Sequence, residues 1–224
     1  PDAAVPNLPF LHRALLLPLL SAASAASALL RLPVILSSSP LRSRRTLPVP
    51  VISVGNLTWG GNGKTPMVDF LARRFHAMGV SPLILTRHRS LLRDVEIVMV
   101  NGLTPWGNTH FIPRGPMREP LSALTRADIV VIHHADLACE AQLETIARTV
   151  QDSGTTCSVF FSKLAPSHIF EVHQPLQRLS LNVLDGMIVL CVSAIGCPDA
   201  FIHTVREISG IISTLSTLRS FFQL

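Results

Sequence analysis

The sequence predicts an α/β protein with a doubly wound, mainly parallel sheet, and three observations lead to this prediction. Most apolar runs are continuous rather than alternating, which is typical of strands that are covered on both faces. Segments with helical periodicity stand between several of these runs. With 224 residues, of which 48% are hydrophobic and 15% are charged, the chain has the composition of a globular protein that buries one core.

The predicted elements follow one another along the chain. The apolar runs that we interpret as strands are LPVPVISVGN, SPLILT, VEIVMVN, ADIVVIHH, CSVFFSK and MIVLCVSAIG. Further helices are predicted at residues 120–126, 137–152 and 198–209. The helix after the first strand has the clearest pattern, because Pro66 lies in its first turn and Gly79 ends it. Its apolar residues share one face: Met67, Phe70, Leu71, Phe75 and Met78.

The connection between the second and third predicted strands is too short for a parallel sheet. Only TRHRSLLRD separates Leu85 from Val95. A crossover between parallel strands needs about a dozen residues or more and usually contains a helix. We therefore expect either an antiparallel pair of strands at this point or the absence of a segment.

The turn after the first strand has the composition of a phosphate-binding loop. Glycines lack a Cβ and let backbone N–H groups point towards an anion, and the helix that begins at once adds its positive end. Lys64 supplies a mobile charge for the outer phosphates, and the Thr65 hydroxyl can ligate Mg²⁺. Lys64 is one of only two lysines in a chain with nineteen basic residues, which suggests that a compact, flexible cation is required there.

This loop is assigned to nucleotide binding, with Lys64 also catalytic and Thr65 also the Mg²⁺ ligand. Its residues are Thr58, Trp59, Gly60, Gly61, Asn62, Gly63, Lys64 and Thr65. The match to G-x-x-x-x-G-K-S/T is not strict, because Thr58 stands where the first glycine is expected. A glycine-rich turn with an exposed lysine is the alternative. The strand before and the helix after favour a phosphate loop, and hence a sheet of the P-loop NTPase type.

A phosphoryl-transfer enzyme also needs an acidic residue near the end of a neighbouring strand to hold Mg²⁺. The two relevant strands end in Asn101 and in a pair of histidines instead. Asp136 lies a little beyond the second of these strands. Glu119, in the loop PRGPMREP, is the candidate catalytic carboxylate, and the alternative for it is an ion pair with Arg118.

Residues that commonly bind zinc form no recognisable site in the sequence. The four cysteines make no C-x-x-C pair. His133 and His134 are adjacent, so on a strand their side chains are expected on opposite faces, where they would not share a metal.

The first 46 residues form an apolar and basic segment. Residues 14–30 are uncharged, but they are at the lower limit of length for a membrane span and include Pro18. Six basic residues and one acidic residue precede Asp69, and the rest of the chain is neutral. This asymmetry favours a membrane or targeting role over nucleic-acid binding. The segment is interpreted as a membrane-surface helix, an organellar transit segment or a short signal peptide, of which the first two are compatible.

Four stretches resemble consecutive landmarks of the tetraacyldisaccharide 4'-kinases, the lipid A 4'-kinases. They are PVPVISVGNLTWGGNGKTP, RDVEIVMVNGLTPWGN, PRGPMREPLSALTRADIVVIHH and LCVSAIGCPDAF. The resemblance reaches from about residue 11 to about residue 209. It implies binding of Mg-ATP at the loop, with Thr58 normal for the family. It also implies transfer of the γ-phosphoryl group to the 4'-hydroxyl of a tetraacylated glucosamine disaccharide 1-phosphate.

The resemblance further implies a location at a membrane surface. This would be the cytoplasmic face of a bacterial inner membrane, or a mitochondrion or plastid if the N-terminus is a transit segment. The partners implied are the acylated disaccharide lipid and the membrane, and no nucleic acid.

The sequence departs from the family pattern at two places. After LILTR the family has a long segment that ends in Asp-Asp-Gly-x-Gln-His, whereas here Arg87 is followed directly by HRSLLRD. His88 thus resembles the last residue of that motif. The family's second lobe, with its His/Asp-rich motif, has no counterpart after residue 209. The resemblance therefore implies an internally deleted and C-terminally truncated member.

Three parts are expected along the chain. Residues 1–46 are the membrane-associated or targeting segment, residues 47–209 a P-loop kinase-like α/β domain, and residues 210–224 a divergent tail. The expected function is ATP-dependent phosphorylation of the disaccharide. The alternative is a catalytically inactive, membrane-attached module that binds nucleotide through the same loop.

Overall fold

The computed structural model describes residues 10–36, 45–86, 91–193 and 195–210 of the chain. The chain divides into two compact units, Pro1–Ser162 and Lys163–Leu224, and each is described by itself. The predicted tail 210–224 lies, apart from Gly210, outside the described residues. The predicted division between residues 1–46 and 47–209 stays a prediction.

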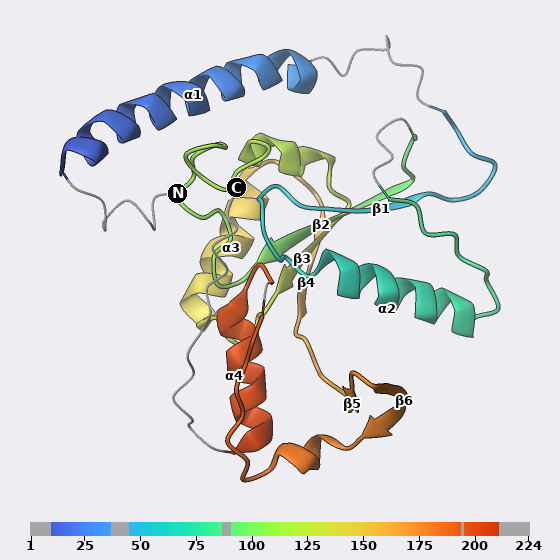
Figure 1. The fold of residues 1–224 in the computed structure, drawn as a ribbon. Helices are drawn as coiled ribbons and strands as arrows, with labels where there is room; N and C mark the ends of the chain where they lie inside the picture. The colour runs from blue at the N-terminus through green and yellow to red at the C-terminus, as the bar shows by residue number, and fades with distance from the viewer. Residues whose placement is uncertain (1–9, 37–44, 87–90, 194, 211–224) are drawn as a thin grey trace. The chain divides into compact units, whose positions relative to one another are not determined.

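A four-stranded parallel sheet forms the centre of the first unit (Figure 1). Its strands are β1 (Ile52–Gly55), β2 (Val95–Asn101), β3 (Ile129–His133) and β4 (Ser158–Ser162), hydrogen-bonded in the order β1-β2-β3-β4. In the parallel register, His133 lies opposite both Asn101 and Ser162. The carboxyl ends of β2, β3 and β4 therefore bring three polar side chains to one edge of the sheet.

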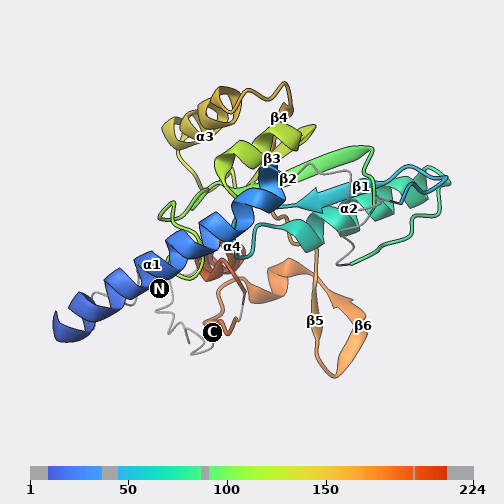
Figure 2. The same cartoon turned by 90° about the horizontal axis from the view of Figure 1, so that it is seen from above.

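Helices cover both faces of this sheet, as the continuous apolar runs predict (Figure 2). On one face, α2 (Lys64–Ala77) packs Met67 and Leu71 against the strand residues Ile97, Met99 and Val131. The other face carries the larger core. It is covered by the 3₁₀ helix η2 (Leu121–Arg126) and by α3 (Glu140–Asp152). The residues that these two helices bury there are Ala123, Leu124, Ile146 and Val150.

The predicted helices agree with the structure in position and differ at some of their starts. The helix predicted at 137–152 begins at Glu140, because Leu137 N donates to His134 O at 3.2 Å and closes a turn instead. The helix predicted at 120–126 is the 3₁₀ helix η2. The helix predicted at 198–209 is α4 (Pro198–Ser209), which starts with proline and ends at Gly210, whose φ is 65°.

Two predicted strands are wrong. Residues 81–86 form no strand, and β1 pairs directly with β2 in parallel, so the antiparallel pair is not formed. Of the last predicted strand, residues 187–193 also form none, and residue 194 lies outside the described residues. Leu83 is 83% exposed and Ile188 is 85% exposed. An apolar run becomes a strand only where a neighbouring strand hydrogen-bonds it, and within the described residues no strand pairs with either run.

The N-terminal segment forms one helix, α1 (Phe10–Leu36). Its serines attach it to the loop that precedes η2: Ser24 Oγ donates to Phe111 O at 2.9 Å, and Ser27 Oγ donates to Ile112 O at 2.7 Å. Among the described residues, no helix combines the length and the apolar character that crossing a membrane requires. Among the side chains of α1 that the structure describes, the large exposed apolar ones are Leu15, Leu16, Leu19 and Leu29.

The second unit contains a hairpin and two helical segments. Strands β5 (Ile169–Glu171) and β6 (Gln174–Leu179) pair antiparallel and are followed by the 3₁₀ helix η3 (Leu181–Leu184). The turn after η3 is attached to the end of α4, because Gly186 N donates to Ser209 O at 3.0 Å.

Candidate functional site

The predicted phosphate loop, residues 58–65, follows β1 and includes the first two residues of α2. Gly60 has a φ of 133° and Gly63 a φ of 74°, conformations that glycine adopts at little cost. Met67 N donates to Gly63 O at 3.0 Å, so the first turn of α2 follows the loop without interruption. The first N–H groups of a helix have no partner within it. They are therefore available to an anion held in the loop.

Buried polar side chains fix the shape of the loop. Asn62 Nδ2 donates to Thr58 Oγ1 at 2.8 Å, and Asn56 Nδ2 donates to Thr58 O. Thr58 and Asn62 are each only 4% exposed. Both side chains are used within the loop, and the backbone N–H of Asn62 donates to Gly60 O at 3.1 Å, so these two residues shape the loop. Thr58 thus has a structural reason to replace the expected glycine, since its hydroxyl accepts a hydrogen bond from Asn62.

Lys64 shares its surroundings with a second cation. Burial lowers the pKa of Lys64, and the positive charge of Arg118 lowers this pKa further. Arg118 is brought here by its backbone, because Arg118 N donates to Leu57 O at 2.7 Å, just beyond the end of β1. Two neighbouring cations, of which Lys64 is partly buried, raise each other's energy, and a bound polyanion relieves this. Arg118 directly precedes Glu119 in the sequence but was not predicted as a site residue.

The remaining loop residues lie at its surface. Trp59 is 66% exposed, and its backbone N–H donates to Pro116 O at 2.6 Å. Gly60 and Thr65 are exposed as well. The structure therefore places the predicted loop residues together, with a buried floor formed by Thr58 and Asn62 and an open side next to Trp59 and Thr65.

Glu119 reaches the end of β1 with its backbone but not with its carboxylate. Glu119 N donates to Leu57 O at 3.3 Å, whereas its carboxylate forms an ion pair with Arg126 of η2. Arg126 Nε also donates to Glu96 Oε1 at 2.6 Å, and Glu96 is buried near the start of β2. This network directs the Glu119 carboxylate towards the opposite edge of the sheet from the loop. The catalytic role of Glu119 stays a prediction.

The two histidines at the end of β3 lie together, and the prediction that they point to opposite faces is wrong. His134 has a φ of 60° and leaves the extended conformation, so the alternation of a strand no longer applies. The two ring centroids are 4.0 Å apart. His133 Nδ1 lies 3.1 Å from Ser162 Oγ. The His133 ring also contacts the phosphate loop, because a Cβ added to Gly63 would lie 2.5 Å from His133 Cδ2.

The pKa of His133 predicts how stability depends on pH. This pKa is lowered from 6.5 to about 4, chiefly by burial and also by the charge of His134, while Asp136 opposes the shift. Between these two values the unfolded chain binds more protons than the folded chain. The stabilisation is therefore fully present above about pH 6.5 and is lost as the pH falls towards about 4, with a total of about 3 kcal/mol from this group.

Urea unfolding at a series of pH values measures this effect as a decrease in the free energy of unfolding from pH 7 to pH 4. Burial also lowers the pKa of His134, which contributes in the same direction. The His133→Asn variant should show a shallower dependence on pH. A variant with the same dependence as the natural chain would contradict the assignment to His133.

In the described part of the chain, no group of three or more His, Cys, Asp and Glu side chains is arranged to hold a metal ion. Magnesium at nucleotide sites is usually held by one or two protein groups together with phosphate oxygens and water. Thr65, in the first turn of α2, therefore suits such a partial site.

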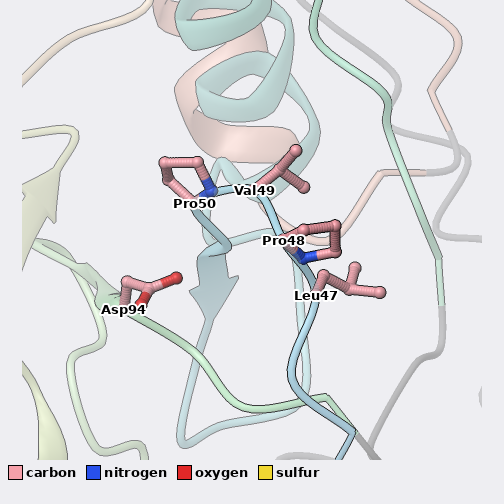
Figure 3. Close-up of a pocket in the computed structure, with 5 residues that line it drawn as sticks. All are labelled: Leu47, Pro48, Val49, Pro50 and Asp94. Atoms are coloured by element: carbon pink, nitrogen blue, oxygen red, sulfur yellow. The ribbon is translucent and has the colours of Figure 1, made fainter.

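A shallow depression lies at the other end of β1 (Figure 3). Val51 N donates to Asp94 Oδ2 at 2.7 Å beside it. Because the phosphate loop follows the carboxyl end of β1, this depression at the amino end is separate from the loop. The residues that line it are Leu47, Pro48, Val49, Pro50 and Asp94.

The loop with its lysine, and the strands around it, match a known family. The family model of tetraacyldisaccharide-1-P 4'-kinase matches residues 13–87 and 88–218. The chain belongs to this 4'-kinase family. Its curated relatives are phosphotransferases, so the chain is a member of a kinase family, as the resemblance in the sequence implies.

Individual relatives support the same assignment. The probable mitochondrial tetraacyldisaccharide 4'-kinase of Arabidopsis thaliana is 35% identical over 280 residues, covering 91% of this chain and 71% of the relative. The 4'-kinase of Anaeromyxobacter sp. (strain K) is 34% identical over 140 residues, covering 61% of this chain and 36% of the relative. A solved structure of LpxK from Aquifex aeolicus in complex with ATP has a TM-score of 0.57 at 19% identity, over 92% of this chain and 81% of that one. This last similarity supports the α/β fold.

The 4'-kinase match is interrupted where the sequence analysis expects a missing segment. The two matched segments meet between Arg87 and His88. The alignment with the Arabidopsis relative extends over 280 positions, which is longer than the whole 224-residue chain. The relative therefore has residues inside the aligned region that this chain lacks. Residues 87–90 lie outside the described part of the structure.

Proposed function

We propose that this chain binds Mg-ATP at the phosphate loop and transfers the γ-phosphoryl group to the 4'-hydroxyl of a tetraacylated glucosamine disaccharide 1-phosphate, a step of lipid A biosynthesis. The observation that carries this proposal is the joint placement of Gly63, Lys64 and Arg118 at the start of α2. Membership of the 4'-kinase family supplies the reaction class and the acceptor.

The residues present fit a nucleoside triphosphate. The positive φ of Gly63 and its lack of a Cβ suit a loop whose backbone N–H groups surround phosphate oxygens. Lys64 and Arg118 would neutralise the outer phosphates, where charge develops during transfer. Thr65 would hold Mg²⁺ through its hydroxyl, and the ion would offset further phosphate charge.

The acceptor side of the reaction is assigned to Glu119. A carboxylate that accepts the proton of the attacking hydroxyl is a usual component of phosphoryl transfer. In the structure this carboxylate is paired with Arg126. We therefore propose that Glu119 takes this role only after its ion pair with Arg126 has been exchanged for contacts with the substrate.

We further propose that the protein lies at a membrane surface through α1. The serine side of this helix is used in contacts with the 111–112 backbone, and leucines such as Leu15, Leu19 and Leu29 remain exposed. An apolar helical face of this kind binds at the boundary between lipid headgroups and acyl chains. The Arabidopsis relative is described as mitochondrial, which supports a mitochondrial or plastid membrane over the bacterial alternative of the cytoplasmic face of an inner membrane.

The test is a transfer assay with the purified full chain, ATP, Mg²⁺ and the acylated disaccharide 1-phosphate in detergent micelles. We expect formation of the 4'-phosphorylated product, dependent on Mg²⁺ and lost in Lys64→Ala. Binding of ATP without transfer would support the second candidate, an inactive membrane-attached nucleotide-binding module. The interruption of the family match between Arg87 and His88 favours that candidate. A chain that does not bind ATP would contradict both.

A further inference from the structure

We propose that His133 is a positioning residue of the nucleotide site, whose ring supports Gly63 and thereby sets the affinity of the phosphate loop for the outer phosphates of ATP. This inference rests on the proposed function and deepens it. It assigns a role to a residue that lies about seventy positions after the loop in the sequence and that carries no motif of its own.

The His133 ring occupies the space beside the Gly63 Cα. A Cβ added to Gly63 would lie 2.5 Å from Cδ2, 2.7 Å from Nε2 and 2.8 Å from Cγ of the ring. Real Cβ atoms do not approach other atoms this closely, so the ring packs directly against the glycine. Gly63 immediately precedes Lys64, the first residue of α2. A movement of Gly63 therefore moves both the loop N–H groups and the lysine.

One contact holds the ring of His133, and another holds its backbone. Ser162, at the end of β4, lies 3.1 Å from Nδ1, and the parallel register places it opposite His133. Gly102 N donates to His133 O at 2.6 Å. A Cβ on Gly102 would lie 3.0 Å from the same oxygen, so a glycine lets the two backbones approach. His133 is 5% exposed, and a buried ring held in this way is a rigid support for the loop.

The support acts by shape and hydrogen bonding rather than by charge. His133 is neutral near pH 7, because burial lowers its pKa to about 4. The charged and titratable groups that affect it are His134 and Asp136. A neutral ring therefore adds no third cation beside Lys64 and Arg118. Anion binding by a backbone loop depends on N–H groups held in fixed directions, and the ring fixes these directions through Gly63.

The experiment measures the dissociation constants of ATP and AMP by calorimetry, with Mg²⁺, for the natural chain and for variants. We expect His133→Ala to weaken ATP binding about tenfold, a factor that corresponds to about 1.4 kcal/mol. AMP lacks the outer phosphates, so its affinity should change much less. His133→Phe keeps a ring but loses the Ser162 contact and should give an intermediate loss. His76→Ala is the matched control, because His76 is an exposed histidine on α2. This variant should bind ATP with the affinity of the natural chain.

A double-variant cycle tests the contact itself. Gly63→Ala should weaken ATP binding strongly in the natural chain, where the new Cβ meets the ring, and much less in the His133→Ala background, where the ring is absent. In both backgrounds, alanine at position 63 has the same conformational cost from its positive φ, so this cost cancels in the comparison. Equal effects of Gly63→Ala in the two backgrounds would overturn the inference.

The outcomes separate this inference from the proposed function. The inference is wrong and the proposed function stands if the natural chain binds ATP, Lys64→Ala binds it much more weakly, and His133→Ala binds it as well as the natural chain. Equal losses for ATP and AMP would also overturn it, since they indicate a general loss of structure. If the natural chain does not bind ATP, both fail. If His133→Ala does not fold, the ATP affinities of His133→Phe and Ser162→Ala are measured instead. Unchanged ATP affinity in both variants would overturn the inference.

Discussion

Replacing Lys64 by alanine is expected to weaken ATP binding by at least about 30-fold. Removing one partner from a desolvated, hydrogen-bonded charge pair costs about 2–5 kcal/mol, of which the lower limit corresponds to about 30-fold. Lys64 is suited to such an effect because it is partly buried, at the start of α2, and its pKa is already lowered by burial and by Arg118. Calorimetric titration with Mg-ATP measures the loss directly.

Lys163→Ala is the matched control for this experiment. Lys163 is the only other lysine of the chain and is exposed, so its replacement removes the same charge and leaves residues 58–65 unchanged. We expect it to leave ATP affinity within about twofold of the natural value, as is usual for exposed charges. Equal losses for the two variants would show that net charge, and not the loop, determines binding.

Replacing Gly63 by alanine is expected to lower both stability and ATP affinity. The φ of 74° costs about 1 kcal/mol for a residue with a Cβ. The new Cβ would also lie 2.5 Å from the His133 ring, and overpacking of this kind typically costs about 1–3 kcal/mol. Urea unfolding should therefore show a loss of about 2–4 kcal/mol in the free energy of unfolding.

Gly79→Ala separates these two contributions. Gly79 follows α2 as Gly63 precedes it, has a φ of 82°, and a Cβ added there would meet no atom within 4 Å. Only the conformational cost of the positive φ remains. The free energy of unfolding of this variant should therefore decrease by about 1 kcal/mol, and its ATP affinity should be unchanged. If both alanine variants were equally unstable, the close contact between Gly63 and His133 would not be the cause.

The segment from β1 through α2 was predictable because its signals are local. Consecutive β-branched residues, closely spaced glycines, Pro66 in the first helical turn and Gly79 at the end each determine backbone conformation within a few residues. Strands β2 and β3 were predictable for a related reason, since their apolar runs are continuous and the sheet buries them between two helical layers.

Residues 81–86 and 187–193 have equally apolar sequences and form no strand. Strand formation needs a partner edge, which the sequence of one segment does not contain. The histidine pair was misjudged for a similar reason. The alternation rule assumes an extended backbone, and the positive φ of His134 arises where β3 ends and the chain turns back.

The sequence by itself determined the position and character of the phosphate loop: a strand, a glycine turn and a lysine at the first residue of a helix. The 4'-kinase family and the interruption near Arg87 also followed from it. Only the tertiary structure decided what surrounds the loop. Arg118 comes close to Lys64, the His133 ring packs against Gly63, and Glu119 pairs with Arg126. Local backbone preferences act over a few residues, whereas these contacts depend on how the parallel strands and the segments that connect them pack together.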